Sequence, residues 1–140
     1  MSREANTMEI LLVEDDEGDA KAVLRAFKKA NCPYPIHRAM DGLEALDRLD
    51  ELQFPKDIIL LVDINMPRMN GIELINAIRE NENLKKLIVF VLTTSKSDED
   101  IAKAYEKNIA GYITKSKMGE EFQKLTNLIN NYQEIVELPR

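Results

Sequence analysis

The chain has 140 residues, a length typical of one domain, and 44% of them are hydrophobic. Its net charge is −6 and its basic residues form no cluster, whereas binding to nucleic-acid phosphates requires clustered lysine and arginine. No apolar run reaches the roughly 18 residues of a membrane span, and the N-terminus lacks the apolar segment of a signal peptide. We therefore expect a cytoplasmic protein with neither a nucleic-acid nor a membrane partner.

Short apolar runs alternate with segments of helical periodicity along the chain. The runs expected to form strands are Ile10–Val13, Ile36–Ala39, Ile58–Val62, Leu87–Leu92 and Tyr112–Ile113. Three of them are continuously apolar, as in strands that are buried on both faces of a sheet. Five strands that each precede a helix predict a doubly wound α/β fold, with helices on both faces of a parallel sheet.

The helices are predicted from apolar residues that recur three or four positions apart. Their expected ranges are Glu17–Ala30, Gly42–Leu49, Ile72–Glu80, Asp98–Lys107 and Glu120–Leu138. In the first four, the residues expected to face the core are Ala22, Phe27, Leu43, Leu46, Leu49, Ile72, Ile75, Ile78, Ile101 and Ala104.

The last helix carries a longer apolar stripe and ends just before Pro139. The helix exceeds the length needed to cover a five-stranded sheet, so its end either packs on its own domain or forms a dimer contact. The stripe consists of Phe122, Leu125, Leu128, Ile129, Tyr132, Ile135 and Val136.

Acidic residues follow two of the expected strands. Glu14, Asp15 and Asp16 end the first strand within the sequence ILLVEDDEGDA, and Asp63 ends the third. Functional residues of doubly wound sheets lie at the carboxyl ends of the strands, where the first and third strands can be neighbours. Grouped carboxylates repel one another unless a cation lies between them. Oxygen ligands without histidine or cysteine favour Mg²⁺ over zinc.

The other two strand ends carry Thr93 and Lys115. A carboxylate nucleophile, a divalent metal, a lysine and a hydroxyl together can bind and transfer a phosphoryl group. Each residue alone has a simpler interpretation: the acids could stabilise a helix start, and Asp63 could belong to a turn before Pro67. Their joint placement at four strand ends favours the phosphoryl site.

Three other functional classes fit less well. A phosphatase of the aspartyl-phosphate type would need an acid at position 65, which is Asn65. A flavin carrier would bind the flavin phosphate after the first strand, where the acids would repel it. A phosphotransfer module needs a histidine exposed on a helical bundle, whereas His37 lies in an expected strand. We expect structural roles for His37 and for the single cysteine, Cys32.

The segments LLVEDD, LVDINMPRMNG, VLTTS and GYITKS, in this order and spacing, resemble the CheY-like receiver domains of response regulators in two-component signalling. The resemblance covers nearly the whole chain and implies a flavodoxin-like sheet with strand order 2-1-3-4-5. It also implies a single receiver domain over residues 1–140, with a core of about 8–130 and a C-terminal helix reaching about residue 138. No output domain is expected.

The resemblance implies a phosphorylation site with a bound metal. Asp63 matches the phospho-acceptor, and Glu14 and Asp15 match the acidic pair that binds Mg²⁺ together with Asp63. Asn65 matches the position whose backbone carbonyl ligates the metal, and it is also one of two positions expected to tune dephosphorylation. The second of these positions is Ser95.

Three further residues match the switch of the family. Thr93 matches the hydroxyl that binds the phosphoryl group, Lys115 the lysine, and Tyr112 the aromatic residue that turns inward on activation. The family usually has proline after this lysine, commonly with a cis bond, whereas this chain has Ser116. A cis bond before a residue other than proline costs about 3 kcal/mol, and the sequence leaves both the cis and the trans form open here.

The remaining acids, Asp16, Glu17 and Asp19, are expected to be helix-start charges without a chemical role. The implied function is a response regulator that accepts a phosphoryl group on Asp63 from a sensor histidine kinase. It would catalyse its own phosphorylation and dephosphorylation without being a conventional enzyme. It would then switch the face formed by the fourth helix, fifth strand and fifth helix, for partner binding or homodimerisation.

A narrower resemblance concerns the kinase. TTSKSDEDIAKAY, the Lys-Ser pair and NYQEIVELP are similar to segments of stand-alone regulators that are paired with bacterial and cyanobacterial phytochrome kinases. The kinase is therefore expected to be of the phytochrome type.

Overall fold

The computed structural model describes residues 8–52, 57–64, 66, 69–93 and 98–135. The five strands form one parallel sheet in the order β2-β1-β3-β4-β5, which confirms the predicted fold and strand order. Its elements are β1 (Glu9–Val13), α1 (Glu17–Lys29), β2 (Ile36–Ala39), α2 (Gly42–Leu52), β3 (Ile58–Asp63), α3 (Gly71–Glu80), β4 (Ile88–Thr93), α4 (Asp98–Tyr105), β5 (Gly111–Thr114), the short 3₁₀ helix η1 (Lys115–Lys117) and α5 (Met118–Ile135).

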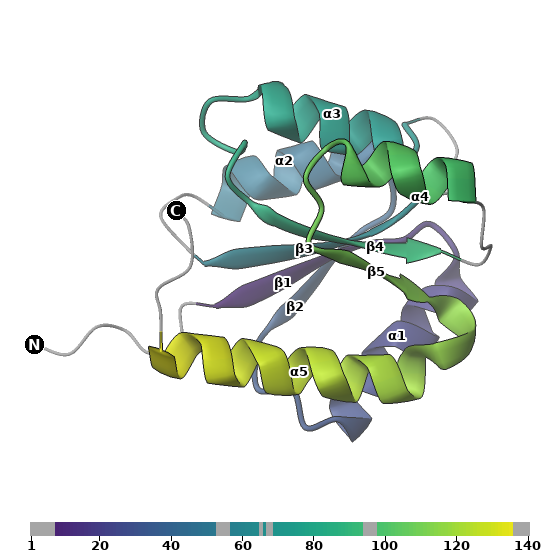
Figure 1. Cartoon of the computed structure of the whole chain (residues 1–140), viewed down its shortest axis with the longest axis vertical. Helices are drawn as coiled ribbons and strands as arrows, with labels where there is room; N and C mark the ends of the chain where they lie inside the picture. Colours follow the sequence, from purple (N-terminus) through teal and green to yellow (C-terminus); the bar gives the residue numbers. More distant parts are fainter. Residues whose placement is uncertain (1–7, 53–56, 65, 67–68, 94–97, 136–140) are drawn as a thin grey trace, which may run out of the picture.

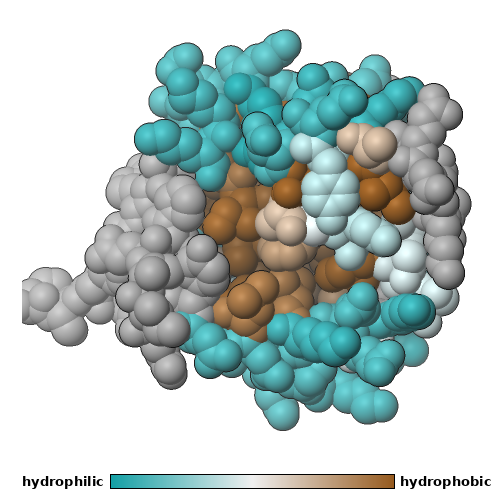
Figure 2. Space-filling model, in the orientation of Figure 1, coloured by the Kyte–Doolittle hydropathy of each residue, from teal (hydrophilic) through white to brown (hydrophobic). Residues whose placement is uncertain are grey.

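The molecule has three layers. Helices α2, α3 and α4 cover one face of the sheet, and α1 and α5 cover the other (Figure 1). Hydrophobic residues gather in the middle layer, between the hydrophilic surfaces of the two helical layers (Figure 2). Among the described residues, no helix combines the length and the apolar composition that crossing a membrane requires.

The central strands divide their side chains between two cores. β1 and β3 are buried along their whole length, and successive residues of a strand point to opposite faces. Leu11 therefore lies in the core under α2 and α3, and Leu12 lies in the core against α1 and α5. In the second core, the rings of Phe27 and Phe122 stack with centroids 4.5 Å apart and join α1 to α5.

The structure corrects several core assignments. Leu43 and Leu128 are each 49% exposed, and in α1 the predicted Phe27 is buried together with Ala20 and Val23, whereas Ala22 is only partly buried. These helices contain more apolar residues than positions that face the core. Helical spacing alone therefore cannot tell the buried apolar residues from the exposed ones beside them. Leu128 lies beyond the edge of the stripe that Phe122, Leu125 and Ile129 form on α5. The side chains of residues 132–135 and the whole of residues 136–138 are outside the described part.

Element boundaries differ from the prediction by a few residues. α4 ends at Tyr105 instead of Lys107, because the next residues form tight turns. The N–H of Lys107 donates to Ala104 and that of Asn108 to Tyr105, and Asn108 has a φ of 60°. Asp63 is the last residue of β3, as predicted.

Helix α3 starts close behind the end of β3. Its cap, Asn70, accepts a hydrogen bond from the N–H of Glu73, whose carboxylate accepts one from the N–H of Asn70. A Cβ on Gly71 would lie 2.5 Å from the backbone oxygen of Asp63 and 2.7 Å from the Cα of Ile64. Glycine is therefore required for this close approach, which fixes the backbone of Asp63.

We predict that Gly71→Ala lowers the free energy of unfolding by about 1–3 kcal/mol, because the methyl group would displace backbone atoms. Urea denaturation measures the change. Gly119→Ala is the matched control, since a Cβ at that position of α5 would meet nothing within 4 Å. It should stabilise the protein by about 0.5–1 kcal/mol through helix propensity. Equal effects of the two substitutions would contradict the packing at Gly71.

Candidate functional site: an acidic cluster at the strand ends

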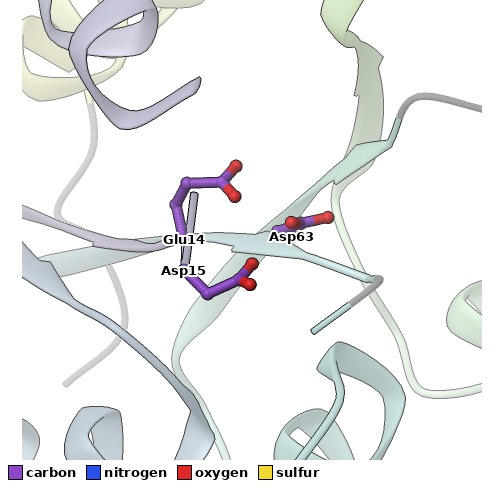
Figure 3. Close-up of side chains that lie close together, drawn as sticks. All are labelled: Glu14, Asp15 and Asp63. Carbon is purple, nitrogen blue, oxygen red and sulfur yellow. The ribbon is translucent and has the colours of Figure 1, made fainter. Parts of the chain in front are cut away.

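The ends of two adjacent strands bring three carboxylates together. Glu14 and Asp15 directly follow β1, and Asp63 ends β3, which pairs with β1 in parallel register. One carboxylate oxygen from each residue lies within 4.8 Å of the other two. Figure 3 shows the side chains of Glu14 and Asp15 leaving the end of β1 and extending toward Asp63. These distances allow one cation to contact all three groups.

Carboxylates that are buried this close together repel one another unless a cation lies between them. Glu14 is fully buried and Asp63 is 3% exposed. Burial raises the pKa of Glu14 to about 7; the nearby Asp63 adds to this rise and Lys115 opposes it.

The oxygens of Glu14 have few partners. The Oε1 atom lies 2.8 Å from Lys115 Nζ without an aligned hydrogen bond, and Oε2 accepts from the N–H of Asp16 at 3.2 Å. A buried carboxylate oxygen without a hydrogen-bond donor, beside two further oxygen donors, fits a hard divalent cation.

Lys115 places its ammonium group among carboxylates from three elements. Its Nζ lies 2.7 Å from Asp19 Oδ2, 2.8 Å from Glu14 Oε1 and 3.4 Å from Asp63 Oδ2. Burial lowers the pKa of Lys115, but Asp19, Glu14 and Asp63 together raise it above its ordinary value. Lys115 therefore carries its charge at any physiological pH.

The contact with Asp19 corrects the sequence prediction, which gave this residue no chemical role. Asp19 lies in the first turn of α1, and its backbone N–H donates to the side chain of Asp16. Asp16 lies at the helix start, as expected, and caps α1, whereas the Asp19 carboxylate pairs with Lys115 across the site. The available signal was that α1 starts at the strand ends, so that its first-turn side chains can reach the same crevice.

Arg38 was missed by the sequence analysis. Its Nε donates to the backbone oxygen of Glu14 at 3.1 Å and its Nη2 to that of Asp15 at 3.3 Å, while Nη1 contacts the carboxylate of Glu17. The guanidinium thus fixes the backbone of the acidic loop from the neighbouring strand β2. Its only sequence signal is a basic residue at the middle of a short strand, IHRA.

Two further predicted residues, Thr93 and Tyr112, lie on the neighbouring strands β4 and β5. Thr93 ends β4, is 2% exposed and pairs in register with Thr114, the residue before Lys115. Tyr112 of β5 is 42% exposed and packs edge-to-face against Tyr105, with ring centroids 6.4 Å apart. The side chain of Tyr112 therefore faces outward in this structure. The predicted residues Asn65 and Ser95 are outside the described part.

His37 and Cys32 do not belong to the cluster. His37 Nε2 lies 2.5 Å from Glu9 Oε1, at the opposite end of β1 from Glu14. Cys32 is half-buried, and burial raises the pKa of its thiol.

The acidic cluster, the lysine and the strand order occur together in a known family. The family model described as the response regulator receiver domain matches residues 10–128. The chain belongs to this family. Response regulator receiver domains are signalling proteins rather than conventional enzymes.

Individual relatives cover almost the whole receiver domain. Response regulator Rcp1 of Synechocystis is 33% identical, over 99% of this chain and 99% of its own length. The crystal structure of the Mn(2+)-bound form of Rcp1 has a TM-score of 0.73 at 32% identity, covering 94% of this chain and 98% of that one.

The crystal structure of the phosphorylated cyanobacterial phytochrome response regulator RcpA has a TM-score of 0.74 at 28% identity. It covers 94% of this chain and 98% of that one. The predicted resemblance to phytochrome-associated response regulators is confirmed.

We predict that, in buffer containing a chelator, the free energy of unfolding falls as the pH rises from about 4.5 to about 7. Over this interval folded Glu14 retains a proton that the unfolded chain has released, so deprotonation favours unfolding. The fall should not exceed about 3 kcal/mol. Denaturant titrations at several pH values measure it.

Glu14→Gln should remove most of this fall, and the exposed Glu106→Gln should leave it unchanged. The same pH dependence in wild type and Glu14→Gln would show that another group causes it.

Proposed function

We propose that this receiver domain is a stand-alone response regulator that accepts a phosphoryl group on Asp63 from a phosphohistidine of a sensor histidine kinase. The observation that supports it most is the convergence of Glu14, Asp15 and Asp63, with Lys115 Nζ 3.4 Å from Asp63 Oδ2. A carboxylate nucleophile beside a fixed cation is suited to attack a phosphoryl group, because the cation balances the negative charge of the phosphoryl oxygens.

The proposed reaction has one bond-forming step. A carboxylate oxygen of Asp63 attacks phosphorus, the P–N bond to histidine breaks, and the electron pair leaves with the imidazole. Lys115 balances the negative charge on the phosphoryl oxygens. In dephosphorylation, water attacks phosphorus, the O–P bond to Asp63 breaks, and inorganic phosphate leaves.

The reaction is proposed to depend on Mg²⁺. Glu14, Asp15 and Asp63 would hold the ion, together with the backbone carbonyl of Asn65. The ion would supply positive charge for the transferred oxygens. Two related proteins support the proposal: the Mn(2+)-bound form of Rcp1 supports the metal site, and the phosphorylated form of RcpA supports phosphorylation.

Phosphorylation is proposed to switch the surface formed by α4, β5 and α5. Thr93 would bind a phosphoryl oxygen, and Tyr112 would leave its exposed position against Tyr105 and turn inward. Asn65 and Ser95 would tune the access of the hydrolytic water. A single added group would thus shift a two-state equilibrium.

The proposed kinase is of the phytochrome type, supported by the relationship to RcpA. The receiver domain would act in the cytoplasm and bind no nucleic acid, in keeping with its net charge of −6. A stand-alone role, with one domain over residues 1–140, is supported by the match to 99% of the length of Rcp1.

We predict that Asp63→Asn abolishes phosphorylation by acetyl phosphate in the presence of Mg²⁺, because the amide cannot form the acyl phosphate. Intact-protein mass spectrometry detects the added phosphoryl group. Asp41→Asn is the matched control: Asp41 is also buried and follows a strand, and asparagine can still cap α2. Chelation of Mg²⁺ should abolish labelling of both the wild type and this control. Persistent labelling of Asp63→Asn would refute the assignment.

The proposal includes homodimerisation through α5 and the α4-β5-α5 surface. Three large hydrophobic side chains there are exposed, namely Leu128, Tyr105 and Tyr112. A dimer contact through α4, β5 and α5 would remove these apolar side chains from water.

We predict that beryllofluoride with Mg²⁺, a mimic of the phosphoryl group, shifts the protein toward dimers in sedimentation experiments. Leu128→Gln should weaken the dimer about tenfold, since less apolar area is buried. Leu24→Gln on α1, at a similar exposure, is the control. Monomers at high concentration with and without the mimic would remove dimerisation from the proposal.

A further inference from the structure

Asp19 contacts the lysine of the site without belonging to the metal-binding cluster. Its carboxylate lies 2.7 Å from Lys115 Nζ, the shortest of the three contacts of that ammonium group. The cluster of possible metal ligands consists of Glu14, Asp15 and Asp63. Asp19 is therefore a fourth carboxylate at the site, directed at the lysine.

Among the described residues, Lys115 Nζ donates hydrogen bonds to Asp19 and Asp63 and forms an ion pair with Glu14. An ammonium group has three N–H donors and no acceptor, and it faces Asp19, Glu14 and Asp63. A phosphoryl group on Asp63 would bring additional anionic oxygens next to this ammonium group. The contact with Asp63 passes to the phosphoryl group on that residue, and a closer approach of Lys115 to the phosphoryl oxygens draws the ammonium group away from Asp19 or Glu14.

Burial decides which partner is released at the lowest cost. The Glu14 side chain has no exposed surface, so water cannot replace Lys115 at its carboxylate. The Asp19 side chain is 41% exposed, so water can solvate its carboxylate after the contact breaks. The contact between Lys115 and Asp19 is therefore the one that exchanges for a phosphoryl oxygen.

We propose that Asp19 competes with the phosphoryl group for Lys115 and thereby lowers the affinity of the site for that group. This inference rests on the proposed function of Asp63 as phospho-acceptor. Asp19 forms no covalent bond in the reaction: it exchanges a charged hydrogen bond and repels the incoming phosphoryl oxygens. Asp19 acts through Lys115 and is therefore a positioning residue.

The start of α1 fixes the position of Asp19 beside Lys115. The N–H of Asp19 donates to the cap Asp16 at 2.7 Å, which fixes the backbone at the start of the helix. The ion pair then ties the first turn of α1 to Lys115, the residue after β5. When Lys115 moves to the phosphoryl group, this link between α1 and the end of β5 breaks.

The test compares Asp19→Asn with Asp16→Asn, which also removes one negative charge nearby but retains a capping side chain. Calorimetry measures the affinity for beryllofluoride at saturating Mg²⁺, and mass spectrometry measures the fraction phosphorylated by acetyl phosphate. Asp19→Asn should bind beryllofluoride about two- to fivefold more tightly than the wild type, the effect of one partly exposed ion pair. It should also reach a higher phosphorylated fraction. Asp16→Asn should change both values much less.

A second pair of variants tests whether the effect of Asp19 on the site acts through Lys115. In Lys115→Met, the additional Asp19→Asn substitution should leave the affinity for beryllofluoride nearly unchanged, since the contested donor is absent. Asp19→Glu should return the affinity toward that of the wild type. A role of Asp19 in stability alone would lower the unfolding midpoint of Asp19→Asn without changing its affinity for beryllofluoride.

Three results would overturn the inference: unchanged or weaker beryllofluoride binding by Asp19→Asn, equal effects of Asp19→Asn and Asp16→Asn, or an undiminished effect in Lys115→Met. In each case labelling of wild type but not of Asp63→Asn would leave the proposed function intact. If the wild type itself were neither labelled nor bound beryllofluoride, both the proposed function and the inference would fail.

Discussion

The ion pair between Lys115 and the buried Glu14 is the interaction on which the rest of the site depends. Lys115 follows β5 and Glu14 follows β1, and β3 and β4 lie between these two strands in the sheet. The lysine therefore spans the carboxyl ends of the central strands and passes close to Asp63. Without this cation the three buried or half-buried carboxylates would face one another alone, a costly arrangement in a protein interior.

The surrounding structure fixes these groups in place. Arg38 holds the backbone of the acidic loop, the start of α3 lies directly behind Asp63, and Asp16 caps the helix that carries Asp19. The single positive charge of Lys115 faces the three carboxylates of the cluster and also the Asp19 carboxylate, so negative charge is in excess. Residual negative potential on a rigid set of oxygens is the property expected of a site for a divalent cation.

The sequence predicted the sheet and the cluster because both follow from simple rules. Continuous apolar runs identified the buried strands, and the strand-end rule located Glu14, Asp15, Asp63, Thr93 and Lys115. The contacts of Asp19 and Arg38 were not predictable in the same way, since they depend on how α1 and β2 are oriented relative to the acidic loop. Charges at a helix start have an ordinary explanation in the helix dipole, which concealed the role of Asp19.

The central claim is that the carboxylates form a cation site and that Lys115 serves the phosphoryl group beside it. A crystal structure of the protein with Mg²⁺ and beryllofluoride tests this claim most directly. We expect one Mg²⁺ ion bound by Glu14, Asp15 and Asp63, with Lys115 Nζ contacting a fluorine atom of the beryllofluoride on Asp63 and no longer contacting Asp19. A metal bound elsewhere, or beryllofluoride on a residue other than Asp63, would contradict it.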